Sequence, residues 1–259
     1  MVGFSRPFPR AKITPVLQTV VLTVLVAGAA VLYSAVGHAG ASGYLAAMAL
    51  LGVAPEVMKP TALLLNLIVA SIATVRFARA GYFSAALLWP FALGSVPFAF
   101  LGGALQLPGH WYRRVVGVVL IVAAVKLALE SMAASSPATR RLPIAPAIGL
   151  GAAIGFLAGL TGTGGGIFLS PLLLFTRWAD TRATGGVTPA FILLNSAAGL
   201  TGNLASVRAV PSVAVVWAVA AAVGGLIGSE LGSRRIGGRA FRRVLAAVLL
   251  VAAAKLLFA

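Results

Sequence analysis

The sequence predicts an all-α polytopic membrane protein made of two inverted-topology repeats, and three observations predict it. First, 60% of the residues are hydrophobic and 9% are charged, and apolar stretches of about 20 residues follow one another along the chain. Second, the chain repeats itself. Third, each repeat contains one apolar segment too short to cross a bilayer. This composition excludes soluble classes of protein.

The internal repeat has a separation of 129 residues. Tyr-Arg-Arg-Val at residues 112–115 returns as Phe-Arg-Arg-Val at 241–244, and a valine- and alanine-rich run follows each motif. We therefore divide the chain into a first transmembrane repeat at 1–132, a polar linker at 133–143 and a second transmembrane repeat at 144–259. The basic N-terminus and the apolar run behind it resemble a secretory signal. Because the second repeat has a matching segment, we expect the first to be retained.

Apolar runs bounded by Pro, Gly and basic residues predict five helices in each repeat. In the first repeat they lie at Thr14–Val36, Ser42–Leu51, Pro60–Val75, Phe83–Leu105 and Trp111–Met132. In the second repeat they lie at Ile144–Leu160, Ile167–Phe175, Val187–Ser206, Pro211–Leu231 and Ala240–Phe258.

The second helix of each repeat cannot span the membrane alone. Ser42–Leu51 and Ile167–Phe175 are about ten residues long, and at 1.5 Å per residue neither crosses about 30 Å of hydrocarbon. Because each follows a glycine-rich break, we expect each first pair of helices to form a broken unit inside the membrane. This unit makes an even number of passes and the three further helices make the total odd. The second repeat is therefore expected to insert upside down relative to the first.

The charges indicate which partners to expect. The chain has 20 Lys and Arg against 4 Asp and Glu, and we expect the basic residues, Lys59 and Lys126 among them, to flank the apolar spans. At that position they contact lipid headgroups, and nucleic acid is not an expected partner. Cysteine is absent, which excludes disulfides and thiolate chemistry. Paired carboxylates, a His-Glu cluster and a nucleophile beside a base are also missing, so a membrane enzyme is disfavoured and no cofactor or metal is expected.

Glycine-rich breaks are the first candidate for a binding site. Gly162-Thr163-Gly164-Gly165-Gly166 interrupts a helix, and a less glycine-rich copy contains Gly37, His38 and Gly40. Glycine tolerates positive φ, so backbone N–H groups can converge on a ligand there. The N-terminus of each following helix adds unpaired N–H groups and the positive end of its dipole. We expect the two N-termini to face each other around a small anion.

Close helix packing is the alternative explanation for glycine in a membrane protein. We favour it for the scattered glycines Gly94, Gly102 and Gly103. For the run from Gly162 to Gly166 we favour anion binding, because so many glycines in so few residues carry an entropic cost that a structural helix avoids.

Four further polar side chains fall within the apolar spans or the first break. Asn66 and Asn195 occupy matching positions of the two repeats, six residues after Pro60 and Pro189. A buried amide needs a partner, which is either a neighbouring helix or the substrate. His38 could bind the anion, carry a proton or be structural. Among the acids only Glu230 falls within a span, as a coupling group or as an ion-pair partner of Arg234.

The second-half motifs resemble the signature of the sulfite exporter TauE/SafE family. They are Gly155-Phe156-Leu157-Ala158-Gly159-Leu160-Thr161-Gly162-Thr163-Gly164-Gly165-Gly166, Pro171, Thr188-Pro189-Ala190 and Asn195-Ser196. The first half resembles a degenerate copy through Gly37, Gly40, Pro60-Thr61, Asn66 and Leu101-Gly102-Gly103. The likeness runs from about Val16 onward. It implies a carrier for sulfite, sulfoacetate or another sulfonate in the cytoplasmic membrane.

The sequence thus leads to a secondary transporter that works by alternating access, with a proton or sodium as possible coupling ion. The expected substrate-binding residues are Gly37, His38, Gly40, Asn66, Thr163, Gly164, Gly165, Gly166 and Asn195. A carrier for another small anion such as a carboxylate and an anion channel are the alternatives.

Overall fold

The computed structural model describes residues 14–130, 140–234, 249–251 and 253–258, and all regular structure in these ranges is helical. The first repeat contains α1 (Pro15–Ser34), α2 (Ala41–Leu50), α3 (Pro55–Arg79), α4 (Ala85–Ala104) and α5 (Gly109–Glu130). The second repeat contains α6 (Ile144–Thr161), α7 (Gly166–Phe175), α8 (Thr181–Gly202), the 3₁₀ helix η1 (Leu204–Ala209) and α9 (Ala214–Arg234). Residues 249–251 and 253–258 are helical, and the rest of the predicted helix Ala240–Phe258 lies outside the described residues.

The third helix of each repeat begins earlier than the sequence predicts. The predicted starts at Pro60 and Val187 are wrong, because α3 begins at Pro55 and α8 at Thr181. The side chain of Asp180 caps α8 by accepting a hydrogen bond from Ala183 N at 2.7 Å. Pro60 and Pro189 therefore lie inside helices, where each removes one backbone hydrogen bond and favours a kink. The helix α8 also ends at Gly202 rather than at Ser206, since the chain tightens there into the 3₁₀ helix η1.

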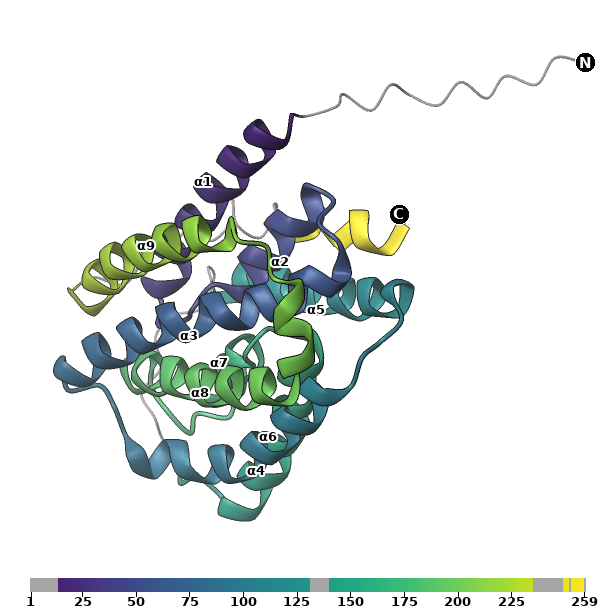
Figure 1. Ribbon diagram of the computed structural model, residues 1–259. Coiled ribbons are helices and arrows are strands. Elements are labelled where there is room, and N and C mark those ends of the chain that lie inside the picture. Colours follow the sequence, from purple (N-terminus) through teal and green to yellow (C-terminus); the bar gives the residue numbers. More distant parts are fainter. Residues whose placement is uncertain (1–13, 131–139, 235–248, 252, 259) are drawn as a thin grey trace, which may run out of the picture.

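The six long apolar helices are arranged symmetrically around the contact between α3 and α8. Neighbouring helices follow one another in the order α1, α9, α3, α8, α4, α6 (Figure 1). Each helix of one repeat therefore has neighbours equivalent to those of its counterpart in the other repeat, with α3 equivalent to α8, α1 to α6 and α4 to α9. The short helices α2 and α7 pack beside α3 and α8 respectively, and α5 packs against both short helices. This reciprocal pairing is what two copies of one unit require. The inverted insertion of the copies stays a prediction.

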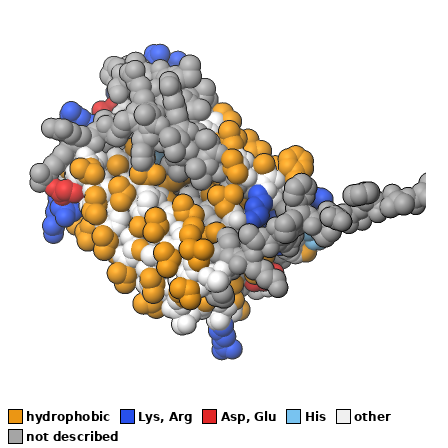
Figure 2. Space-filling view, turned by 90° about the horizontal axis from the view of Figure 1, so that it is seen from above, with side chains coloured by type: hydrophobic (Ala, Val, Ile, Leu, Met, Phe, Trp, Pro, Cys, Tyr) orange, Lys and Arg blue, Asp and Glu red, His pale blue; other side chains and the backbone are white. Residues whose placement is uncertain are grey.

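The fold is that of a polytopic membrane protein. The helices α1, α3, α4, α6, α8 and α9 are long and apolar enough to cross a bilayer, whereas α2 and α7 have only ten residues each. The predicted spanning helix α5 is not among the six, because Arg113, Arg114 and Lys126 fall within its 22 residues. Figure 2 shows hydrophobic side chains over most of the described part of one face, as lipid contact requires.

Glycines allow the two outer helix pairs to pack backbone against backbone. A Cβ atom at three α6 glycines would collide with carbonyl oxygens of α4, in the pairs Gly151 with Phe91, Gly155 with Ser95 and Gly159 with Ala99. On α9, Gly224, Gly228 and Gly232 meet α1 in the same way. The packing interpretation is confirmed for the scattered glycines, because Gly94 and Gly102 meet α6 and Gly103 meets α8.

Candidate functional site

The two glycine-rich breaks lie against each other. His38, in the break between α1 and α2, has its Nε2 atom 3.2 Å from the carbonyl oxygen of Gly166, the first residue of α7. These residues are 128 positions apart in the chain, and His38 is only 6% exposed. The two breaks therefore meet in the interior, while the arrangement of the two helix N-termini around an anion stays a prediction.

Both short helices begin directly after a glycine in the left-handed region. Gly40 (φ 109°) precedes α2 and Gly165 (φ 84°) precedes α7, and φ is also positive at Gly37, Gly162 and Gly164. Side chains rarely tolerate this conformation, which explains why glycine occupies these positions. The backbone bonds at the start of α7 begin with Phe168 N, which donates to Gly165 O at 3.0 Å. The N–H groups before it, those of Gly166 and Ile167, have no acceptor within their own helix, so α7 presents donors at the break.

The second break packs against α3 and α8 where these two helices contact each other. A Cβ atom at Gly164 would lie 2.8 Å from Asn66 Nδ2 and 3.0 Å from Ser196 Oγ. Asn66 Nδ2 itself donates to Ser196 Oγ at 3.3 Å, so this asparagine joins the two repeats. The structure thus brings Asn66 and Gly164 together.

Asn195 has no such protein partner. It is fully buried, and both its Nδ2 and its Oδ1 lack a hydrogen-bond partner among the described residues. It follows Phe191 by one helical turn and precedes Gly199 by another, and these two residues lie beside Gly165 and Gly159 respectively. Asn195 therefore lies on the face of α8 that contains the residues next to α6 and the second break. A buried amide without a partner is costly, and a bound polar ligand would remove that cost.

Thr163 uses its hydroxyl group locally. Thr161 donates its hydroxyl proton to Leu157 O at 2.7 Å, so the contact of 2.9 Å between Thr161 Oγ1 and Thr163 Oγ1 takes its proton from Thr163. Thr163 has no second hydroxyl proton for an anion. Tyr112 OH also donates to Thr161 O at 2.9 Å and joins α5 to this break.

A buried lysine, not predicted as a site residue, completes the region. Lys126 of α5 is 6% exposed and its Nζ lies 2.8 Å from His38 Nε2. Ser170 Oγ lies 3.0 Å from the same ring nitrogen and 3.1 Å from Thr188 Oγ1, so α7 and α8 take part. The expected place of Lys126 beside the spans is wrong, because α5 packs against both short helices and turns this side chain inward. The available signal was a lysine preceded by eleven uncharged, mostly aliphatic residues.

Lys59 is also buried, although it was expected beside the spans. It is 7% exposed, and its Nζ donates to Gly102 O at 3.2 Å, Gly103 O at 2.7 Å and Leu105 O at 3.0 Å. These carbonyls end α4, so the ammonium group caps the negative end of that helix.

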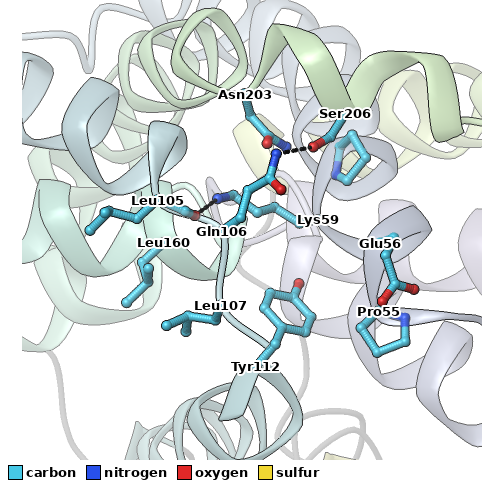
Figure 3. A pocket seen from close by; sticks show the side chains of 11 residues that line it. Pro55, Glu56, Lys59, Leu105, Gln106, Leu107, Tyr112, Leu160, Asn203 and Ser206 are labelled. Atoms are coloured by element: carbon cyan, nitrogen blue, oxygen red, sulfur yellow. Dashed lines mark hydrogen bonds between the residues drawn. The ribbon is translucent and has the colours of Figure 1, made fainter. Parts of the chain in front are cut away.

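A cavity of about 70 Å³ opens beside Lys59 and has room for several water molecules (Figure 3). Its lining includes Glu56, Gln106, Tyr112, Leu160 and Asn203. Leu160 is close to Gly162 in the sequence, and the backbone of Lys59 lies against Gly162 in the structure. The cavity therefore lies next to the second break.

Glu230, the acidic residue expected within a span, forms an ion pair. Glu230 of α9 pairs with Arg76 near the end of α3, and the side chains are 32% and 40% exposed respectively. The ion-pair interpretation of Glu230 agrees with this contact, while the side chain of its expected partner Arg234 lies outside the description. Within the described ranges, no group of three His, Asp or Glu side chains could hold a metal ion.

Comparison with known proteins adds an independent finding. The family model described as "Sulfite exporter TauE/SafE" matches residues 20–256. A similar protein of Sinorhizobium fredii (strain NBRC 101917 / NGR234), "Probable membrane transporter protein y4hK", is 42% identical over 232 residues, which cover 88% of this chain and 94% of that protein. No solved structure is significantly similar to this chain.

Proposed function

From the premise that this chain belongs to the sulfite exporter TauE/SafE family of membrane transporters, we propose that it is a secondary carrier for a small organosulfur oxyanion. Sulfite, sulfoacetate and other sulfonates are the proposed substrates. The carrier works by alternating access in the cytoplasmic membrane, around a site at the meeting point of the two breaks.

The meeting of the two breaks around buried donors carries this proposal. His38 of one break contacts Gly166 of the other, and the buried Lys126 ammonium lies beside His38. A helix N-terminus and a cation in one apolar surrounding favour a negative ligand over a neutral or positive one.

Backbone N–H groups and side-chain amides are the two kinds of donor in the proposed site. Backbone N–H groups near Gly164, Gly165 and Gly166 bind the oxyanion oxygens. Asn195 contributes a side-chain amide that has no protein partner among the described residues, and Asn66 contributes a second amide from the opposite repeat. Gly37 and Gly40 let the first break approach closely, as in the contact of Gly37 with the Gly185 backbone.

Each end of α3 has a feature that the proposed transport cycle uses. The cavity beside Lys59 is the route from one side of the membrane. At the other end of α3 the Arg76–Glu230 pair links the repeats, since α3 and α9 belong to different halves. Alternating access then moves one repeat against the other around the site.

Thermal stabilisation and counterflow together test the function. The detergent-purified protein is heated with sulfite, sulfoacetate, toluenesulfonate, sulfate, acetate or lactate, because a ligand of the folded state raises its apparent stability. We expect stabilisation by sulfite or sulfonates only. Liposomes loaded with the stabilising anion should then take up the labelled anion by saturable counterflow, which a channel does not perform. Stabilisation confined to acetate or lactate would favour a carboxylate carrier, and the absence of counterflow with every anion would contradict a carrier.

A further inference from the structure

We propose that Lys126 and His38 form a proton-binding pair that couples anion movement to one proton. This inference rests on the proposed function, since it names the coupling ion of the same site. The pair combines residues of α5 and of the first break, and both side chains are 6% exposed.

The surroundings fix which nitrogen of His38 can change its protonation. Nδ1 lies 3.1 Å from the carbonyl oxygen of Val36, which can only accept, so Nδ1 carries a hydrogen. Nε2 lies 2.8 Å from Lys126 Nζ. Nε2 is therefore the ring nitrogen at which the pair can gain or lose a proton.

Each protonation state of Nε2 has partners. Without a proton, Nε2 accepts from the Lys126 ammonium and from the Ser170 hydroxyl at 3.0 Å. With a proton, Nε2 donates to Gly166 O at 3.2 Å or to Ser170 Oγ. Ser170 Oγ can then donate to Thr188 Oγ1 at 3.1 Å, so its hydroxyl proton has an acceptor in both states. A structural histidine needs only one set of partners, whereas a group that gains and loses a proton needs both.

Charge repulsion links the second proton to the anion. Two positive charges 2.8 Å apart in a buried place repel strongly, so the empty site holds a single positive charge on the pair. An anion at the start of α7 offsets a second charge, since His38 of the pair contacts Gly166, the first residue of that helix. One proton enters with the anion, binds at Nε2 and leaves with the anion on the other side. No covalent bond changes except those to this proton.

The other polar groups around the pair come from four elements. Tyr33 of α1 has its ring centre 6.4 Å from that of His38, and Tyr44 of α2 donates its hydroxyl to Ala39 O. Ser170 of α7 and Thr188 of α8 complete the surroundings. The side chain of Glu130, one turn beyond Lys126 on α5, lies outside the described residues.

Accumulation driven by a pH gradient tests the coupling in the intact protein. Proteoliposomes with the membrane potential held at zero by valinomycin and potassium receive the labelled anion that gave counterflow, toluenesulfonate being the first probe. With the outside one pH unit more acidic, coupling to one proton predicts about tenfold accumulation. Counterflow without such accumulation would overturn the proton pair and leave the carrier intact, whereas absence of counterflow would contradict the carrier itself.

His38→Gln assigns the coupling to the pair, and His110→Gln is the matched control. Glutamine can accept from Lys126 and donate to Gly166 but cannot take up a proton at this position. We expect its accumulation ratio to fall to about one, while His110→Gln stays near tenfold. A His38→Gln protein that accumulates like the wild type would overturn the assignment. Proton uptake on binding, measured with wild-type protein in weakly buffered detergent solution, decides the proposal even where the variant does not fold: uptake supports it and no uptake overturns it.

Discussion

Asn66 of α3 donates a hydrogen bond to Ser196 of α8 at 3.3 Å. Asn195, the equivalent residue of the second repeat, has no equivalent bond to the described part of the first repeat. The residue that matches Ser196 in the first repeat is Leu67, which offers no hydrogen-bonding group to Asn195. Both asparagines are fully buried. One amide therefore joins the repeats, while the other lacks a protein partner within the described part of the chain.

This difference predicts opposite effects of two alanine substitutions. Asn195→Ala removes no protein hydrogen bond, so it should leave thermal stability nearly unchanged and weaken anion binding about tenfold or more. Asn66→Ala should also lower stability, by about 1 kcal/mol, because Ser196 loses its partner. Titration of the thermal shift with the binding anion measures both quantities. Unchanged affinity in Asn195→Ala would return that residue to a structural role.

Gly165→Leu should abolish transport and leave membrane insertion intact. Gly165 has φ 84°, and a Cβ atom there would lie 2.9 Å from Ile154 and 3.0 Å from Phe191. A leucine must therefore either adopt the left-handed region, which costs roughly 1–2 kcal/mol, or leave that region and displace the start of α7. Counterflow and membrane yield check the two parts. Gly28→Leu is the control, because nothing lies within 4 Å of its Cβ position. Normal counterflow by Gly165→Leu would contradict the proposed role of this break.

The fold class, the irregular backbone of the two breaks and the burial of both asparagines could be predicted from the sequence, because each depends on a local pattern. Glycine runs and Pro60 with Pro189 mark irregular backbone wherever they occur. The starts of α3 and α8 could not be predicted from the prolines, because each helix extends at least a full turn before its proline.

The buried lysines could not be placed from the sequence for a different reason. A lysine near the end of an apolar run reaches the interface unless other helices surround it. For Lys126 the surrounding helices are α2 and α7, and for Lys59 the acceptors are carbonyls more than 40 residues away. Such environments depend on tertiary packing, so the Lys126–His38 contact appears only in the structure.

Lys59→Met should destabilise the protein because it leaves carbonyls at the end of α4 without a donor. Each unpaired buried carbonyl costs about 1–3 kcal/mol, and the cavity lets water reach some of them, so we expect a loss of about 2–4 kcal/mol. Thermal unfolding in detergent measures it. Lys255→Met is the matched control, since Lys255 is exposed and donates to the single carbonyl of Leu50. Equal stability of the two variants would show that the cap contributes little.

Two alanine substitutions within α6 should change stability in opposite directions. Gly155 faces the backbone of α4, and a Cβ atom would collide with the carbonyl oxygen of Ser95, so Gly155→Ala must push the helices apart. Overpacking of this kind costs about 1–3 kcal/mol. Gly149 lies on the same helix with nothing within 4 Å of its Cβ position. There alanine should stabilise by up to about 1 kcal/mol, because it favours helix more than glycine does. Thermal unfolding of both variants under identical detergent conditions gives the two signs, and stabilisation by Gly155→Ala would mean that α4 and α6 are not in backbone contact.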